Sequence, residues 1–318
     1  MDDRTSTLRV HGALRRAHGV PVARGELTID PGFARDFLNW RRPGAGGEAL
    51  SDVDRLAACC RELALDLVCL PLPAWDDRTL AAFSADAGRL AVAGLFVFAV
   101  VDGAFQSALT EIGMIDLMTE VGRSPEDAGR ELRRRSRRVT AAVARGAEAG
   151  AHGIIVADDI ACGRGPLVAP VFVERFLRPL WEEQVRAAHE VGLPVLLHSD
   201  GNLTAVLEQV AAAGFDGVQC IEAAAGMDPH AVQARWGDRL CLMGTIDPAL
   251  LVDPAASRGG GSSVDALEAT VAETMACAAE GGGIIFGTCS GLYAGLSPAR
   301  VERMYRLARD LDPFRSAA

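Results

Sequence analysis

Polar residues that could bind a metal or carry out catalysis follow the short apolar segments of the chain. Each of them comes directly after a run of residues that has the composition of a buried β-strand. One aspartate follows the first of these runs, two adjacent aspartates follow the next run, and a His-x-Asp pair follows the third. Further along come a glutamate, an aspartate and a cysteine. The complete set is Asp102, Asp158, Asp159, His198, Asp200, Glu222, Asp247 and Cys289.

The spacing of His198 and Asp200 places both side chains on one side of an extended segment, because side chains at i and i+2 of a strand point the same way. With Glu222 and Cys289 they form a mixed set of nitrogen, oxygen and sulfur donors. Zinc accepts these donors, and a catalytic zinc keeps one position open. We therefore predict a metal site of His198, Asp200, Glu222 and Cys289. The alternative is that the His-x-Asp pair forms only a structural hydrogen bond.

The remaining carboxylates are candidates for acid–base catalysis, each with a structural alternative. Only one of the neighbours Asp158 and Asp159 can point inward from a strand, and either could instead cap the following loop. Asp247 precedes Pro248, which also fits an N-cap. The candidate catalytic residues are Asp102, Asp158, Asp159, Asp200 and Asp247.

These residues acquire a common location if the chain folds as a barrel. Eight apolar strand candidates alternate with longer segments of helical spacing, which is the pattern of a (β/α)8 barrel, an α/β fold. In this fold the carboxyl ends of all strands meet at one mouth, where catalytic residues lie. The prediction is one barrel domain over residues 1–318, with residues 1–25 as a short extension. The predicted strands are 26–29, 67–70, 92–101, 153–157, 194–198, 217–221, 240–243 and 283–286.

Composition excludes several classes of function. The chain has 318 residues and a formal net charge of -10, which argues against a nucleic-acid-binding surface. It contains no lysine, so neither Schiff-base chemistry nor a Walker-type phosphate site is available. The longest apolar run, 90–101, is too short to span a bilayer, and the first residues lack the apolar core of a signal peptide. We expect a cytoplasmic protein with no membrane contact and with reduced cysteines.

Several motifs, in order along the chain, resemble the uroporphyrinogen decarboxylase superfamily. They are FAVVDGAFQSA (98–108), GAHGIIVADDIA (150–161), PVFVERFLRPLWEEQVRAAHEVGLPVLLHSDGN (170–202), GFDGVQCIEA (214–223), LMGTIDPALL (242–251) and GGGIIFGTCSGLYAGLSPARVERMY (281–305). The resemblance implies a (β/α)8 barrel of the uroporphyrinogen decarboxylase type. The superfamily contains heme-pathway decarboxylases and also zinc-dependent methyltransferases that act together with corrinoid proteins.

The resemblance favours the methyltransferase branch. True uroporphyrinogen decarboxylases carry an N-terminal arginine-rich motif that binds the substrate carboxylates, and the segment LRRAHGVPVARGELTIDPGF (14–33) lacks it. At the metal positions His198 matches the zinc histidine of the methyltransferases, Cys289 the C-terminal zinc cysteine, and Glu222 an acidic residue that binds the metal when substrate is absent. The departure is Asp200, where the coenzyme M methyltransferases have cysteine.

A carboxylate in place of a thiolate makes zinc a stronger Lewis acid, better suited to an oxygen or nitrogen leaving group. The resemblance therefore implies zinc-dependent transfer of a methyl group between a small donor, such as a methyl ether, and a corrinoid (cobalamin). No Asp-x-His-x-x-Gly motif for binding a corrinoid occurs here, so the corrinoid would be carried by a separate protein. We also expect that two copies of this chain form a homodimer.

Two other functions stay open on the sequence alone. A metal-independent decarboxylase or lyase could act on a small carboxylated substrate through these carboxylates and Arg164 or Arg178. A barrel without catalytic activity could bind a small molecule or a partner enzyme. Metal content distinguishes the first alternative from the methyltransferase. The convergence of carboxylates at strand ends argues against the second, because buried charge is costly to keep.

Overall fold

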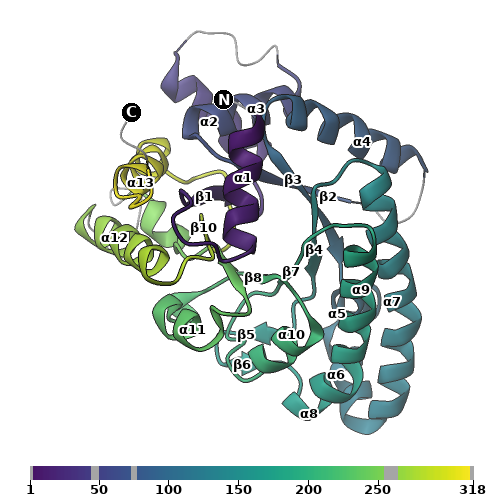
Figure 1. Ribbon diagram of the computed structural model, residues 1–318. Helices are drawn as coiled ribbons and strands as arrows, with labels where there is room; N and C mark the ends of the chain where they lie inside the picture. The colour runs from purple at the N-terminus through teal and green to yellow at the C-terminus, as the bar shows by residue number, and fades with distance from the viewer. Residues whose placement is uncertain (1–2, 44–49, 73–76, 254–263, 316–318) are drawn as a thin grey trace.

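The computed structural model describes residues 3–43, 50–72, 77–253 and 264–315, and a closed barrel of parallel strands lies at its centre (Figure 1). The strands follow one another around the barrel in the order β1-β10-β9-β8-β7-β4-β3-β2. This confirms the predicted (β/α)8 barrel. The strands are β1 (Ala23–Glu26), β2 (Leu67–Pro71), β3 (Phe96–Asp102), β4 (Gly153–Ala157), β7 (Val195–His198), β8 (Gly217–Gln219), β9 (Cys241–Met243) and β10 (Ile284–Phe286).

Helices surround the barrel and return the chain to the start of each next strand (Figure 1). The α-helices are α1 (Asp3–Leu14), α2 (Pro31–Arg41), α3 (Asp52–Leu63), α4 (Asp77–Val92), α5 (Ala104–Ile112), α6 (Met114–Arg123), α7 (Pro125–Glu148), α8 (Pro170–Phe172), α9 (Arg178–Glu190), α10 (Leu207–Ala213), α11 (Pro229–Trp236), α12 (Val264–Gly281) and α13 (Pro298–Asp310). Shorter elements of the described residues include the β5–β6 hairpin (Ala161–Cys162 and Gly165–Pro166), a π-helical turn (Val173–Leu177) and the 3₁₀ turns Ala223–Ala225 and Pro248–Leu251.

Two layers of apolar side chains hold the fold together, and strand residues alternate between them. One layer fills the barrel interior, and the other lies between the barrel and the helices. On β3, for example, Phe96 and Phe98 point inward whereas Val97 and Ala99 point outward. Helix α1 adds Val10, Ala13 and Leu14 to the interior layer, so it covers one end of the barrel. The carboxyl ends of the strands form the other, open end.

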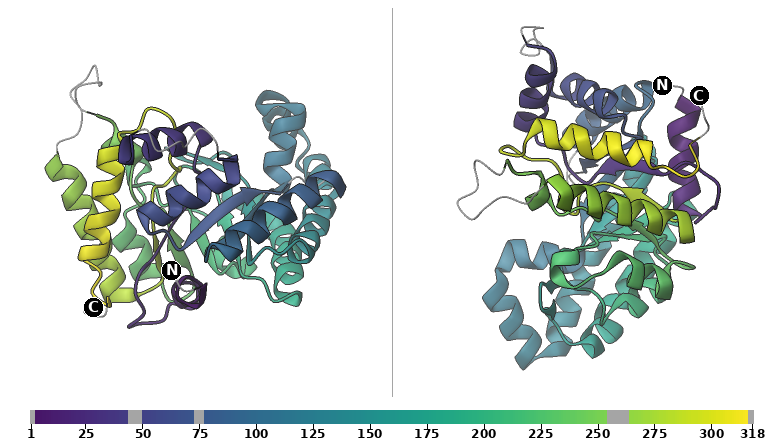
Figure 2. Two further views of the ribbon diagram at one scale, coloured as in Figure 1. Left: turned by 90° about the horizontal axis from the view of Figure 1, so that it is seen from above. Right: turned by 90° about the vertical axis from the view of Figure 1, so that its left-hand side faces the viewer.

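Helices α5 and α6 project beyond the barrel on the side opposite α1 (Figure 2). They lie in the connection between β3 and α7, where the sequence pattern predicts no element. Among the described residues, no helix combines the length and the apolar character needed to cross a membrane.

The first strand lies three residues earlier than predicted, at Ala23–Glu26 instead of 26–29. The prediction was wrong because it looked for apolar residues, whereas two outward residues of this strand are charged. The buried Arg24 lies 3.6 Å from the Asp66 carboxylate, and the buried Glu26 accepts hydrogen bonds from Thr288 and Tyr305. Ionisable side chains can occupy a buried strand when suitable partners lie beside them, here the Asp66 carboxylate for Arg24 and neutral N–H and O–H donors for Glu26. The segment 1–25, predicted as a short extension, contains helix α1 and the start of β1.

The buried Glu26 carboxyl predicts a pH dependence of stability. Burial raises the pKa of Glu26 from 4.5 to about 7. Between these values the unfolded chain loses its proton while the folded protein keeps it, so the free energy of unfolding falls as pH rises from about 4.5 to about 7. The loss is about 3 kcal/mol, from 1.36 kcal/mol per pKa unit. Below this window the contribution is fully present, and above it no further loss occurs.

The variant Glu26→Gln should lack this loss. Its amide oxygen can accept from the Thr288 N–H and the Tyr305 hydroxyl, and its NH₂ group can donate to the Thr288 hydroxyl oxygen. We expect equal stability of variant and wild type at pH 4.5, and a variant more stable by about 2–3 kcal/mol at pH 8. Urea denaturation at both pH values measures the difference. A constant difference across this range would contradict the prediction.

Candidate metal centre

The alternation of strand residues decides which predicted side chains reach the open end of the barrel. Positions two residues beyond an inward residue also point inward. Because Phe98 and Ile155 line the interior, Asp102 and Asp159 continue their inward rows. His198 continues the row of Leu196, and Cys289 continues the row of Ile285. Asp102, Asp159, His198 and Cys289 therefore face one mouth.

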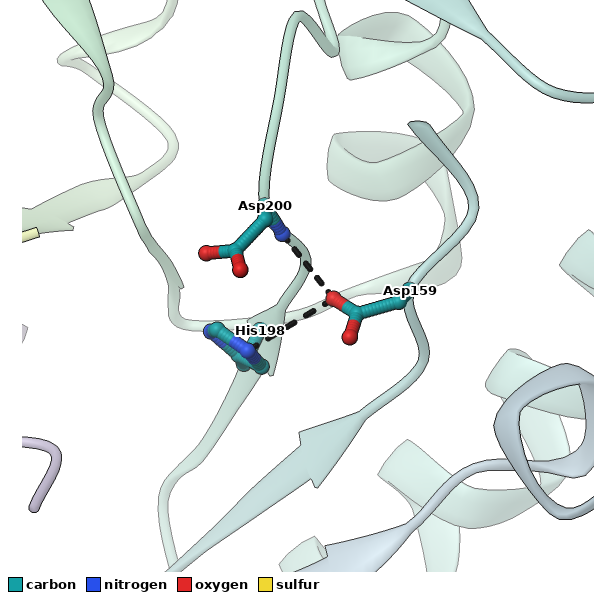
Figure 3. Close-up of side chains that lie close together, drawn as sticks. All are labelled: Asp159, His198 and Asp200. Atoms are coloured by element: carbon teal, nitrogen blue, oxygen red, sulfur yellow. Dashed lines mark hydrogen bonds and ion pairs between the residues drawn. The ribbon is translucent and has the colours of Figure 1, made fainter. Parts of the chain in front are cut away.

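Three side chains at this mouth form a group that could hold a metal ion. Asp159 follows β4, His198 ends β7 and Asp200 lies two residues further on (Figure 3). One ligand atom from each lies within 4.8 Å of the others, and no other such group occurs in the described part of the chain. The Nε2 atom of His198 is 3.6 Å from Asp159 Oδ1. Among the predicted ligands, His198 and Asp200 belong to this group, whereas Glu222 and Cys289 lie outside it.

Hydrogen bonds from backbone N–H groups to side chains tie the loops after β4, β7 and β8 to one another. Asp200 N–H donates to Asp159 Oδ1 over 3.0 Å, which the dashed line in Figure 3 marks. The N–H of Ile160 donates to the Ser199 hydroxyl, and the N–H of Gly201 donates to Glu222 Oε2. Glu222, predicted as a metal ligand, therefore anchors the loop that carries Asp200. The three members of the group keep their relative positions because the chain segments that carry them are bonded.

Gln219 connects His198 to the loop after β10, and no prediction from the sequence included it. It is fully buried and lies directly beside His198 in the register of β7 and β8. Its Oε1 atom contacts His198 Nδ1, and its Nε2 donates to the Cys289 carbonyl oxygen over 2.7 Å. The only signal in the sequence was a polar residue at the end of an apolar strand.

Asp158 points away from this group, between the barrel and the helices. Its side chain is fully buried and accepts hydrogen bonds from Phe105 N–H, Gln106 N–H and Trp181 Nε1–H, at 2.8, 2.9 and 2.9 Å. Burial raises the pKa of Asp158 to about 6 despite these bonds. Asp159 is thus the inward member of the pair. Asp158 joins the start of α5 to α9.

The other predicted residues take separate places around the mouth. Asp102 lies beside the group with its residue partly open to solvent, and partial burial of the carboxyl group, followed by the nearby Asp159 charge, raises its pKa. Asp247 caps the 3₁₀ turn at Pro248 by accepting from Ala249 N–H over 2.8 Å. Cys289 is 5% exposed and contacts the Cys220 thiol, so that the pKa of Cys220 is raised, first by this contact and then by burial.

Comparison with known proteins assigns the chain to a family. Residues 92–311, more than half of the chain, match the model of the uroporphyrinogen decarboxylase (URO-D) family. The chain belongs to the uroporphyrinogen decarboxylase family. The matched region contains the metal group and all the other predicted site residues. No curated protein matches the sequence closely enough to count as a relative.

Solved structures share the fold of this uroporphyrinogen decarboxylase family member. A methyltransferase from Methanosarcina mazei is similar with a TM-score of 0.72 and 18% sequence identity, over 96% of this chain and 98% of that one. A sugar phosphate isomerase/epimerase from Parabacteroides distasonis has a TM-score of 0.50 and 12% identity, over 92% of this chain and 95% of the other. At such identities the likeness establishes the barrel architecture alone.

Proposed function

We propose that the protein is a zinc-dependent methyltransferase that moves a methyl group between a small donor, such as a methyl ether, and the corrinoid of a separate protein. The observation that carries this proposal is the group of Asp159, His198 and Asp200 at the barrel mouth. Membership of the uroporphyrinogen decarboxylase family and the fold shared with the methyltransferase from Methanosarcina mazei support it. We further propose a single barrel domain and a cytoplasmic location.

The residues present fit a zinc ion. One imidazole nitrogen and two carboxylate oxygens are accepted zinc ligands, and a set of three protein ligands leaves a position for substrate. His198 is 8% exposed and Asp200 is exposed, so the group faces solvent on one side only. When bound, zinc would polarise the donor's oxygen or nitrogen atom that is bonded to the methyl carbon, and the corrinoid of the separate protein would accept the methyl group.

The chain's own side chains would position the donor and handle the proton. The leaving oxygen or nitrogen needs a proton when its bond to the methyl carbon breaks. We assign this proton to Asp102, because its carboxyl group lies at the mouth beside Asp159, where partial burial and the Asp159 charge raise its pKa. Asp158 is a poorer candidate, since three N–H donors already occupy its oxygens.

The alternative of a lyase acting through Arg178 gains no support from the geometry. Arg178 forms ion pairs with Glu174 and Glu182 on its own side of the barrel, and both are helical neighbours four residues away. Its guanidinium is therefore already paired with carboxylates.

Turnover tests the proposal. The protein would be mixed with reduced cobalamin and, separately, with aryl methyl ethers and methylamines. We expect loss of the Co(I) absorbance and formation of the demethylated donor, detected by mass spectrometry, with at least one donor class. His198→Ala should reduce the rate more than about 100-fold, the range typical for loss of a group essential to catalysis. A zinc-loaded wild type that demethylates no donor, with either free cobalamin or a corrinoid protein, would contradict the proposal.

A further inference from the structure

We propose that Gln219 is the positioning residue of the metal centre: it fixes the proton of His198 on Nδ1 and so directs Nε2 toward the metal. The inference rests on the proposed function only in taking His198 as a metal ligand. Gln219 lies in the strand beside His198, with the two residues paired in register, and its side chain is fully buried.

The Cys289 carbonyl determines which end of the Gln219 amide faces His198. A carbonyl oxygen only accepts hydrogen bonds, so the amide group 2.7 Å from it must be the NH₂ group. The other end of the amide, Oε1, therefore faces His198 Nδ1. An amide oxygen also only accepts, so the imidazole must carry its proton on Nδ1. This assignment follows from the donors and acceptors, which is how tautomers are inferred.

The consequence appears on the other side of the imidazole. With the proton on Nδ1, a neutral His198 presents the unprotonated Nε2 to the mouth, 3.6 Å from Asp159 Oδ1. Two acceptors then face each other, an arrangement that a cation between them satisfies. The Asp200 N–H that donates to the same Asp159 oxygen keeps the carboxylate in this orientation.

A glycine lets Gln219 reach its second partner. The amide extends from β8 past the end of β9 to Cys289, which follows β10. Gly244 follows β9, and a Cβ atom there would lie 3.1 Å from Gln219 Nε2 and 2.4 Å from the Thr288 carbonyl oxygen. The absence of a side chain at Gly244 leaves room for the bridge. Gln219 therefore links His198 to the loop of Cys289.

The variant Gln219→Met tests the proposal, because methionine has a similar volume and forms neither strong hydrogen bond. The matched control is Gln184→Met, since Gln184 is also fully buried but bonds to Ser136 in the helix layer. The first measurement is the His198 tautomer at pH 8 in metal-free protein, from ¹⁵N-histidine NMR, with the signal assigned by its loss in His198→Ala. The second is zinc affinity by competition with a chromogenic chelator.

We expect Nδ1–H in the wild type and in Gln184→Met, and a mixture of tautomers in Gln219→Met. Zinc affinity should fall about 10- to 100-fold in Gln219→Met, the usual effect of losing the group that orients a ligating histidine. Gln219→Glu keeps an acceptor for Nδ1–H and should restore the wild-type tautomer. If Gln219→Met fails to fold, the tautomers of the wild type and of Gln219→Glu still test the role of Gln219.

Four results separate the two proposals. An Nε2–H tautomer in the wild type would overturn the role of Gln219, as would a zinc affinity of Gln219→Met within about threefold of Gln184→Met. A wild type with the Nδ1–H tautomer that Gln219→Met loses, but with no zinc binding, would support the positioning role and contradict the zinc-dependent function. Loss of both tautomer and affinity in Gln219→Met alone would support both.

Discussion

The His198→Ala protein should be purified folded but without zinc, whereas the wild type should contain about one zinc ion per chain. His198 supplies the only nitrogen of the three-membered group, and its removal leaves two carboxylates, one of them exposed. Loss of a direct ligand costs more than loss of a residue behind it, for which 10- to 100-fold is usual, so affinity should fall more than about 100-fold. Elemental analysis and chelator competition measure both quantities.

The control for this experiment is His18→Ala, because His18 is exposed and lies outside the group. It should keep the zinc content of the wild type. A wild type that stays metal-free after incubation with zinc, while folded, would contradict the metal site and leave His198 and Asp200 as an acid–base pair.

The same measurement distinguishes two sets of ligands. The group in the structure contains Asp159, whereas the set predicted from the sequence contains Glu222 and Cys289 in its place. If the structural group holds the ion, Asp159→Asn should lose zinc and Cys289→Ser should retain it. The reverse result would mean that the Cys289 side chain moves toward His198 when the ion binds. Glu222→Gln should keep the ion, since Glu222 bonds to the Gly201 N–H.

The second large effect concerns stability. Asp158→Ala should lower the free energy of unfolding by about 4 kcal/mol, because it leaves three buried N–H donors unpaired and opens a cavity. Two of these donors belong to the first turn of α5, whose N-cap is Gly103 and has no side chain to satisfy them. Asp158 thus caps α5 from a different element. Urea denaturation at pH 7.5 measures the loss.

Asp158→Asn separates the hydrogen bonds from the volume. The amide oxygen of the new side chain can accept hydrogen bonds from the two N–H groups of α5, but its NH₂ group would face the Trp181 N–H. We therefore expect about half of the loss of unfolding free energy seen in Asp158→Ala. Adding Trp181→Phe removes that opposing donor. The loss of unfolding free energy in the double variant should therefore be smaller than the sum of the losses in the two single variants. An Asp158→Ala protein with wild-type stability and zinc content but no methyl transfer would instead assign Asp158 to catalysis.

Much of the architecture could be predicted from the sequence because parallel strands of a barrel are buried on both faces. Such strands are continuous apolar runs between helical segments, as at Gly153–Ala157 and Val195–His198. Position at the end of a strand then selects the polar residues of the mouth. The first strand was misplaced for the same reason, since Arg24 and Glu26 are ionisable side chains that are buried beside partners distant in sequence.

The sequence by itself determined the barrel and its family, and it predicted His198, Asp200, Asp102 and Cys289 as residues of the mouth, because these depend on local pattern and strand order. Only the tertiary structure decided between Asp158 and Asp159. The choice depends on the inward row of β4 and on N–H donors from α5 and α9, which no local pattern contains. The same holds for Gln219, whose role depends on two partners in other strands and on the space left by Gly244.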